Sequence, residues 1–353
     1  MSVRPIAHHS RVVGQFFDVR AIEQELAELR WRLRPDGEVG EAAEHAAAEA
    51  RASTLNLVAV ARTSEEERRV SHTLERMSVH HPSRTLILLA QEQHTVPKLE
   101  ATVSAFTDMS AGRLVANEQV LLHAHGAVAE HLASVVAPLL VPDLPVMLWW
   151  PGRPQLEGRL FNELADLCDR LIIDSNDGID PGQEFSRLLH VARRRTAQIA
   201  VGDFNWARLL PWRQVAAQFF DPPTVRQQLR SIDLVEAWSG GSGSDAQARL
   251  ITGWLQSRLA TLGSVVERRL HHDPDMPAGL CRLELHAEGG RTRFTIKGRP
   301  NECLATDMEI EGQNYPERTV RIATRDAADL LAVEMVETGH DLGYEQSLAA
   351  AAR

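Results

Sequence analysis

The feature that most constrains the fold of this chain is an alternation of short apolar runs with amphipathic segments between residues 53 and 195. Most of these runs lack a polar residue at every second position, which is typical of strands buried on both faces of a sheet. They occupy residues 53–61, 83–90, 117–126, 145–150 and 171–175. Because helical segments separate them, the sequence predicts an α/β fold, with a mainly parallel sheet and helices on both faces.

Helices are predicted before and between these strands. Residues 21–33 have the apolar spacing of an amphipathic helix, and residues 64–80 begin with Ser64 and Glu67, which predict a capping box. An Ala- and Glu-rich segment at 41–50 is also predicted to be helical. Residues 1–17 are expected to be a loose or strand-pairing tail. Further helices are expected at residues 128–140, 160–170 and 181–195.

The alternation of apolar strands and amphipathic helices ends at Asp221-Pro222-Pro223. Beyond this point the chain has a strand, a Gly/Ser-rich loop and a helix, then a hairpin pattern around Gly289-Gly290, another strand and closing helices. A smaller α+β domain is therefore predicted. The expected division is a tail with helices at 1–52, an α/β domain at 53–221 and an α+β domain at 224–353.

Charge and composition exclude several classes of protein. The 353 residues have a formal net charge of −10, which disfavours nucleic acid as a partner because phosphate binding needs a basic surface. No apolar stretch reaches the roughly 18 to 20 residues of a membrane helix, and the N-terminus lacks the apolar region of a signal peptide. Three dispersed cysteines form no CxxC pair. We expect a cytoplasmic protein with no membrane partner.

No pattern in the sequence predicts catalysis. The histidine pairs at 8–9, 80–81 and 271–272 have the wrong spacing for a helical zinc site, and neighbouring residues of a strand point to opposite faces. The Gly-rich stretch at 239–245 lacks the lysine of a phosphate-binding loop, and no GxSxG motif is present. We therefore predict a protein that is not an enzyme and has no metal ion or cofactor.

Polar residues at the ends of predicted strands offer a second hypothesis. His81, Ser83 and Arg84 stand where one strand begins, and Asp174 and Ser175 stand where another ends. The carboxyl ends of parallel strands commonly form a binding crevice. These five residues are candidates for such a crevice, and the alternative function is an enzyme that binds a sugar phosphate or a nucleotide there.

Two adjacent tryptophans, Trp149 and Trp150, end the strand in VPDLPVMLWWPG (141–152). Alternation along a strand places them on opposite faces, so only one of them needs to be in the core. The other, beside Pro151 and Gly152, is a candidate anchor for a protein partner, because tryptophan is enriched among interface hot spots. The alternative is that helices cover both indoles.

Several stretches together resemble one family, the glucose-6-phosphate dehydrogenase assembly proteins called OpcA. They follow one another in the family order between about residues 50 and 330. The most distinctive is the Asn-Trp-Ala-Arg to Pro-Trp-Arg stretch at 205–213. The matching stretches are RASTLNLVAVA (51–61), HHPSRTLILLA (80–90), VAPLLVPDLPVMLWWPGRP (136–154), DRLIIDS (169–175), GDFNWARLLPWRQVAAQFFD (202–221) and ARLITGWLQSRLA (248–260).

The resemblance implies a non-catalytic protein that binds glucose-6-phosphate dehydrogenase, promotes its active oligomer and raises its activity. It thereby implies a role in the oxidative pentose phosphate pathway and in NADPH supply. Cyanobacterial members have a cysteine pair associated with redox control; Cys281 and Cys303 are the candidates here, and their role as a switch is left open. Self-association is also left open. A regulator that binds nucleic acid is a third and weaker hypothesis.

The residues that contact the partner are predicted from the residue types in these stretches. Exposed indoles and arginines are the expected contacts, because both are enriched at interfaces. The predicted partner-binding residues are Trp149, Trp150, Trp206, Arg208, Trp212 and Arg213.

Overall fold

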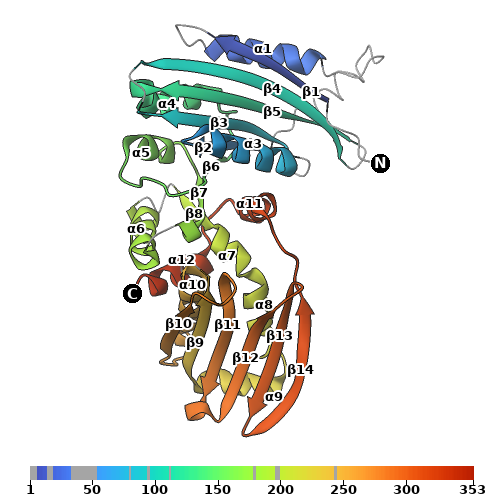
Figure 1. Ribbon diagram of the computed structural model, residues 1–353, viewed down its shortest axis with the longest axis vertical. Coiled ribbons are helices and arrows are strands. Elements are labelled where there is room, and N and C mark those ends of the chain that lie inside the picture. Colours follow the sequence, from blue (N-terminus) through green and yellow to red (C-terminus); the bar gives the residue numbers. More distant parts are fainter. Residues whose placement is uncertain are drawn as a thin grey trace. The chain divides into compact units, whose positions relative to one another are not determined.

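The computed structural model describes residues 6–13, 19–32, 54–78, 81–93, 96–110, 113–177, 180–194, 199–241 and 245–353. Within these ranges the strands form an eight-stranded sheet and a six-stranded sheet (Figure 1). All strands of the first sheet precede residue 204, and all strands of the second follow residue 231. The predicted succession of an α/β part and an α+β part is confirmed. The helix expected at 41–50 lies outside the described residues.

The first sheet is mixed, with a parallel centre. Its order is β1-β4-β5-β3-β2-β6-β7-β8. The register is parallel from β5 through β3, β2 and β6 to β7, whereas β4 pairs antiparallel with both β5 and β1. The strands are β1 (Ile6–Val13), β2 (Leu55–Ala61), β3 (Ser83–Gln91), β4 (Lys98–Ser110), β5 (Arg113–His125), β6 (Val146–Trp150), β7 (Arg170–Ile173) and β8 (Ala200–Asp203). Because β1 pairs with β4, the expected N-terminal tail is of the strand-pairing kind over residues 6–13. The β4 strand was not predicted.

Helices cover both faces of the centre of this sheet. All seven residues of β2 are buried, and successive strand residues point to opposite faces, so neither face is open to water. The α1 helix (Val19–Arg32) packs on β4, and α3 (Ser64–Ser78) packs on β2 and β3. Another helix, α5 (Arg159–Ala165), follows β6. The helix expected at 128–140 is divided into η1 (Gly126–His131), α4 (Leu132–Val136) and η2 (Ala137–Leu139).

The N-cap of α3 is Thr63, one residue before the predicted Ser64, and the return bond from the N3 side chain goes to Arg62 instead of the N-cap residue. The Thr63 hydroxyl accepts the backbone N–H of Glu66 at 3.1 Å, and the Glu66 carboxylate accepts the backbone N–H of Arg62 at 2.8 Å. Thr63 and Glu66 thus take the places expected for Ser64 and Glu67. The prediction of a helix start was right, but its register was wrong, because both adjacent pairs have the same spacing.

The second sheet has the order β10-β9-β11-β12-β13-β14. The β9 and β10 strands are parallel and are joined by α10 (Ala246–Ala260), whereas the remaining pairs are antiparallel. Its strands are β9 (Ile232–Gly240), β10 (Glu267–Asp273), β11 (Gly279–Ala287), β12 (Thr292–Arg299), β13 (Cys303–Ile310) and β14 (Gln313–Arg321). The predicted hairpin is β11–β12, with Gly289 and Gly290 both at positive φ.

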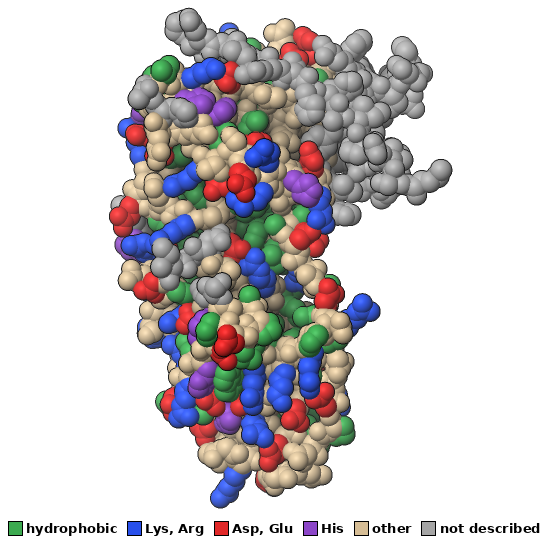
Figure 2. Space-filling model, in the orientation of Figure 1, with side chains coloured by type: hydrophobic (Ala, Val, Ile, Leu, Met, Phe, Trp, Pro, Cys, Tyr) green, Lys and Arg blue, Asp and Glu red, His purple; other side chains and the backbone are tan. Residues whose placement is uncertain are grey.

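Charged side chains pair across the strands of this second sheet. Arg293 bonds Glu309 at 2.8 Å, and Arg299 bonds Glu317 at 3.1 Å. In the orientation of Figure 1, Figure 2 shows Lys and Arg side chains beside Asp and Glu side chains over this sheet. Exposed pairs of this kind contribute little to stability, so this face is polar without being an additional core.

The helices α10, α12 (Leu342–Ala351) and α6 (Pro181–Arg194) pack in a row, with α12 in the middle. Gly253 permits the approach of α10 and α12, because a Cβ atom at this position would lie 2.7 Å from the carbonyl oxygen of Ser347. Tyr344 of α12 is fully buried. Among the described helices, none combines the length and the apolar character needed to cross a membrane.

Two compact units divide the chain, and their segments interleave along the sequence. The first contains Met1–Ile173, Ala197–Ala200 and Ala327–Gly339, and the second contains Asp174–Thr196, Val201–Asp326 and His340–Arg353. The expected boundary at Pro222-Pro223 falls between the strands of the two sheets but inside the second unit. The domain limits 53–221 and 224–353 stay a prediction.

The two candidate redox cysteines are separated by a strand. Cys281 lies on β11 and Cys303 on β13, with β12 between them. Two strand spacings amount to about 10 Å, whereas a disulfide requires Cα atoms within about 7 Å. Both thiols are free in this structure, and burial raises the pKa of Cys281. An internal disulfide between them would require the sheet to rearrange.

A buried ion pair holds α11 (Ala327–Val336) to the first sheet. Arg170 of β7 donates to the Glu334 carboxylate at 2.7 Å and to the Gly339 carbonyl at 2.8 Å. The two side chains of the pair are only 2% and 4% exposed. A buried pair of this kind is costly to break, because the remaining charge has no water to solvate it.

We predict that Glu334→Gln lowers the free energy of unfolding by about 3 to 5 kcal/mol, measured by chemical denaturation. The double variant Arg170→Met/Glu334→Leu should recover most of this loss, because it leaves no buried charge. The matched control is Glu163→Gln, which removes the partly exposed pair with Arg159 and should cost less than about 1 kcal/mol. Equal losses from the two single variants would contradict the prediction.

Candidate functional site

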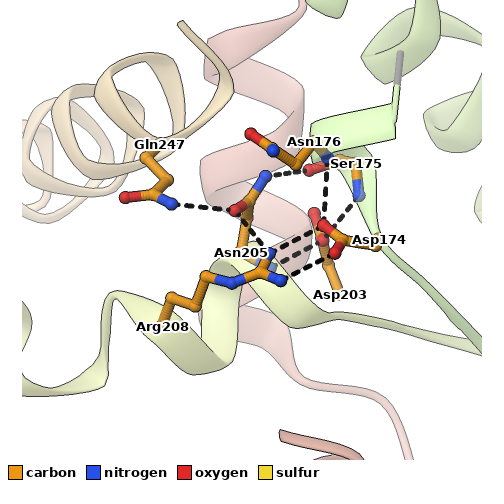
Figure 3. Close-up of polar contacts among 7 residues, drawn as sticks. All are labelled: Asp174, Ser175, Asn176, Asp203, Asn205, Arg208 and Gln247. Atoms are coloured by element: carbon orange, nitrogen blue, oxygen red, sulfur yellow. Dashed lines mark hydrogen bonds and ion pairs between the residues drawn. The ribbon is translucent and has the colours of Figure 1, made fainter. Parts of the chain in front are cut away.

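A polar network forms in the second unit, where the chain leaves β7 and β8 (Figure 3). Its members come from segments far apart in the sequence, namely the residues after β7, the start of α7 (Phe204–Arg208), α10 and α12. We call it the Asp203 network. It consists of Asp174, Ser175, Asp203, Asn205, Arg208, Gln247 and Tyr344.

Asp203 is the centre of this network and is fully buried. One of its carboxylate oxygens accepts the backbone N–H groups of Ser175 at 3.1 Å and Asn205 at 2.9 Å, and the other accepts the Tyr344 hydroxyl at 3.2 Å. It is also the N-cap of α7. Burial raises the pKa of Asp203 to about 6, and the negative charge of Asp174 adds to this effect, although the hydrogen bonds oppose it.

Asn205 joins three other members of the network. Its amide nitrogen donates to the Ser175 hydroxyl at 3.0 Å, and its amide oxygen accepts from Arg208 at 2.9 Å and from Gln247 at 3.1 Å. Arg208 in turn binds Asp174 through two bonds of 2.7 Å. These two side chains are 31% and 17% exposed, so their ion pair reaches solvent, as the half-buried Gln247 also does.

The tryptophans of this stretch are buried beside the network. Trp206 is 4% exposed, and its indole nitrogen donates to Asp341 at 2.7 Å. The Arg213 guanidinium lies 3.5 Å from the centroid of the Trp206 ring, and its Nη2 donates to the Trp206 carbonyl. Trp212 is 6% exposed. The expectation that these indoles are exposed is wrong, because α12 and the second sheet provide them with internal partners.

Trp149 and Trp150 are buried as well, at 3% and 2% exposed. The β6 strand lies between β2 and β7 in the covered part of the sheet, and the Trp150 ring meets Phe161 of α5 edge to face at 5.6 Å. Asn56 holds the preceding loop through bonds to Val141 and Leu144. The expectation of one exposed anchor is wrong here too. A contribution of all six residues to partner binding stays a prediction.

The five crevice candidates do not form one site. His81, Ser83 and Arg84 lie at the amino end of β3, whereas Asp174 and Ser175 follow the carboxyl end of β7. These strands run parallel within one sheet, so the two groups lie at opposite ends of the strands.

Arg84 has a structural role at the amino end of β3. It bonds Glu118 at 2.6 and 2.9 Å, Glu23 at 2.6 Å and the Leu139 carbonyl at 3.1 Å. Its side chain is 8% exposed. The neighbouring Ser83 is engaged as well, since its hydroxyl lies 3.1 Å from that of Thr85.

A pocket of about 180 Å³ does lie at the carboxyl ends of β2, β3 and β6, but other residues line it. Arg62 follows β2, Glu92 follows β3, and Trp150 ends β6. The remaining lining comes from Glu130, Gln155, Gly158, Arg159, Leu160 and Phe161. Pockets that bind small molecules usually measure about 300 to 1,000 Å³, so this pocket gives little support to a nucleotide or sugar-phosphate enzyme.

The Asp203 network fixes backbone geometry rather than presenting a reactive group. Its members hold no imidazole and no thiol, and the Ser175 hydroxyl is held between the Asn205 amide nitrogen and the buried Asp203 carboxylate. Sequence reasoning found Asp174, Ser175 and Arg208 but missed Asp203 and Asn205, which stand close to Arg208 in the chain. Gln247, Asp341 and Tyr344 have no local signal, because only the fold brings them close.

Comparisons with known proteins identify the class and then the family. A model described as the glucose-6-phosphate dehydrogenase subunit N-terminal domain matches residues 74–190, and one described as the C-terminal domain of that subunit matches residues 199–348. The chain belongs to the family that these models define, the OpcA family.

Three cyanobacterial relatives are named as OpcA proteins of the OxPP cycle. The Synechococcus elongatus protein is 30% identical over 71% of this chain and 63% of its own length. The Nostoc punctiforme and Synechocystis proteins are 34% and 32% identical over 46% of this chain, which is 34% of each relative. This chain thus spans less than two thirds of each relative.

Solved structures align only weakly. A dehydrogenase from Clostridium difficile is 9% identical over 84% of this chain and 96% of its own, with a TM-score of 0.42. A likeness at this level indicates neither a shared fold nor a shared function.

The raised pKa of Asp203 leads to a prediction about pH. Between pH 3.8 and about 6 the unfolded carboxyl loses its proton while the folded one retains it, so the folded state binds more protons and stability falls as pH rises. The contribution is at most about 3 kcal/mol, since one pKa unit corresponds to 1.36 kcal/mol.

Asp203→Asn should abolish this contribution, because the amide oxygen can still accept both N–H groups and the side chain no longer titrates. We expect the difference in unfolding free energy between the variant and the parent chain to increase in favour of the variant from pH 4 to pH 7, measured by denaturation at each pH. A difference that does not change with pH would contradict a buried, titrating Asp203.

Proposed function

We propose that this protein is a non-catalytic partner of glucose-6-phosphate dehydrogenase, which binds the active oligomer of that enzyme and raises its activity. It would thereby support the oxidative pentose phosphate pathway and the supply of NADPH. The observation that carries the proposal is the match of two dehydrogenase-subunit models, one after the other, along residues 74–190 and 199–348.

The contacts of residues 205–213, the most distinctive stretch of the sequence, also support a non-catalytic role. Residues 205–213 contribute their polar groups to internal bonds, with Asn205 and Arg208 in the Asp203 network and Arg213 on Trp206. Activation of a partner needs no reactive group. It requires only that the protein bind the active form better than the inactive one, and a tenfold preference corresponds to about 1.4 kcal/mol.

The Arg208–Asp174 pair is the proposed point at which this network meets the dehydrogenase. It is a partly exposed end of a largely buried arrangement, and Asn205 fixes the position of its guanidinium. A preorganised arginine loses little freedom on binding, which favours it as an interface contact. The buried Trp206 and Trp212 and the half-buried Arg213 would act indirectly, by holding this surface in place.

We predict that the purified chain raises the rate of its own organism's glucose-6-phosphate dehydrogenase at limiting substrate and shifts that enzyme to a larger or more uniform oligomer. Rates would be measured with and without the chain, and size by light scattering on the same samples. The chain alone should convert no sugar phosphate. Unchanged kinetics and unchanged size would exclude the proposal, and turnover by the chain alone would favour the enzyme alternative.

Arg208→Ala should weaken complex formation about tenfold or more while the chain remains folded, as judged by circular dichroism and melting temperature. The matched control is Arg159→Ala, which removes an arginine that is likewise paired with a carboxylate, in the other unit. Equal affinities of the two variants for the dehydrogenase would place the contact surface elsewhere, even if the activation itself is observed.

A further inference from the structure

Three potential metal ligands meet on one face of the β4–β5 pair, away from the Asp203 network. His123 and His125 are two residues apart on β5, so their side chains point to the same face. Glu100 of β4 stands directly opposite His123 in the antiparallel register. One ligand atom from each of the three side chains lies within 4.8 Å of the other two.

The chemistry of this group suits a transition-metal ion. Imidazole nitrogen and carboxylate oxygen are the usual ligands of Zn²⁺ besides cysteine, and three protein ligands leave at least one position open. The two imidazole rings have their centroids 4.2 Å apart. All three residues are half-buried, so an ion has access from solvent and the ligands are partly held by their surroundings.

A neighbouring side chain holds the His123 ring in place. The Gln91 side-chain oxygen lies 3.2 Å from Nε2 of His123 and orients the ring. Such a second contact to a carbonyl-type oxygen is common for metal-binding histidines.

A lysine occupies the position next to the carboxylate. The Lys98 ammonium lies 3.0 Å from a Glu100 oxygen, and its side chain is 54% exposed. The ammonium group therefore neutralises the carboxylate that a bound metal ion would neutralise. Because an exposed lysine side chain can turn into solvent, it would compete with the ion without blocking it.

A second cluster of this kind among the described residues has partners that are less exposed than Lys98. Glu236, Glu284 and His286 of the second sheet also bring their ligand atoms within 4.8 Å. There, however, Glu284 is bonded by both Arg282 and Thr295, and these groups would have to leave before a cation could enter. The half-buried group on β4 and β5 is therefore the stronger candidate.

We propose that Glu100, His123 and His125 form a binding site for a divalent ion of the zinc class, with the remaining coordination positions open to water or to an external ligand. The site is independent of the proposed association with the dehydrogenase, since it lies in the first unit and uses none of the residues assigned to that role.

The test is a Zn²⁺ titration of the full chain, after treatment with a chelator, in competition with a chromophoric chelator. The double variant His123→Ala/His125→Ala should bind one equivalent fewer than the parent chain, or bind it at least about tenfold more weakly. Co²⁺ added to the parent chain should give visible absorption from a site with nitrogen ligands, and the double variant should lack it.

Three further variants test whether the ion binds at these side chains. Glu100→Gln, which preserves the size of the side chain, should weaken Zn²⁺ binding without changing the melting temperature of the metal-free chain. Lys98→Gln should strengthen binding, because it removes the competing cation. The matched control His190→Ala, at an exposed histidine of α6, should bind like the parent chain.

Absence of Zn²⁺ binding by the parent chain would overturn the proposal. Equal binding by the parent chain and by the double variant would do the same, and loss of binding in His286→Ala instead would assign the ion to the cluster of the second sheet.

Discussion

A single buried carboxyl group, Asp203, connects the parts of the second unit that the sequence keeps far apart. It accepts hydrogen bonds from Ser175, two residues after β7, from the first turn of α7 and from the C-terminal helix α12. Loss of any one contact would leave a buried acceptor or donor without a partner, which is costly in the absence of water. Asp203 thus helps to fix the position of α12, together with the Trp206–Asp341 bond and the close packing of α12 on α10 at Gly253.

The stretch at residues 205–213 illustrates how an interface composition can serve an internal purpose. Tryptophan and arginine are enriched at protein interfaces because they combine a large apolar surface with directed polar groups. The same properties suit a buried joint between elements. Trp206 uses its indole nitrogen to hold Asp341, at the start of α12, and its ring face to hold Arg213. Arg208, through its pair with Asp174, extends from this stretch to the solvent.

The two units differ in what they offer to other molecules. The first has the Glu100, His123 and His125 group and the small pocket at the ends of β2, β3 and β6. The second has the Asp203 network and a sheet with charged cross-strand pairs. A partner protein and a metal ion would thus address separate units. This separation makes it straightforward to examine each proposal with variants that leave the other site intact.

The class of fold and most of the strands and helices follow from local patterns in the sequence. Apolar runs such as 55–61 and 171–173 are long enough and apolar enough to require burial on both faces, and local spacing fixes the helices between them. The β4 strand was missed, as was β8, which has only four residues, Ala200–Asp203. The β4 strand pairs with β5, which follows it in the sequence, and with the distant β1, and strand formation depends on such pairing more than on local preference.

Tertiary structure alone decided which side chains are buried and which of them meet. The local sequence around a tryptophan is the same whether the indole faces solvent or the core. The exposure of the four tryptophans at 149, 150, 206 and 212 could therefore not be deduced from the sequence. Arg84 and Asp174 both stand at strand boundaries, but they lie at opposite ends of parallel strands and therefore do not meet. Asp203 and Tyr344 are 141 residues apart. Contacts over such separations arise from packing of whole elements, and no local pattern in the sequence records them.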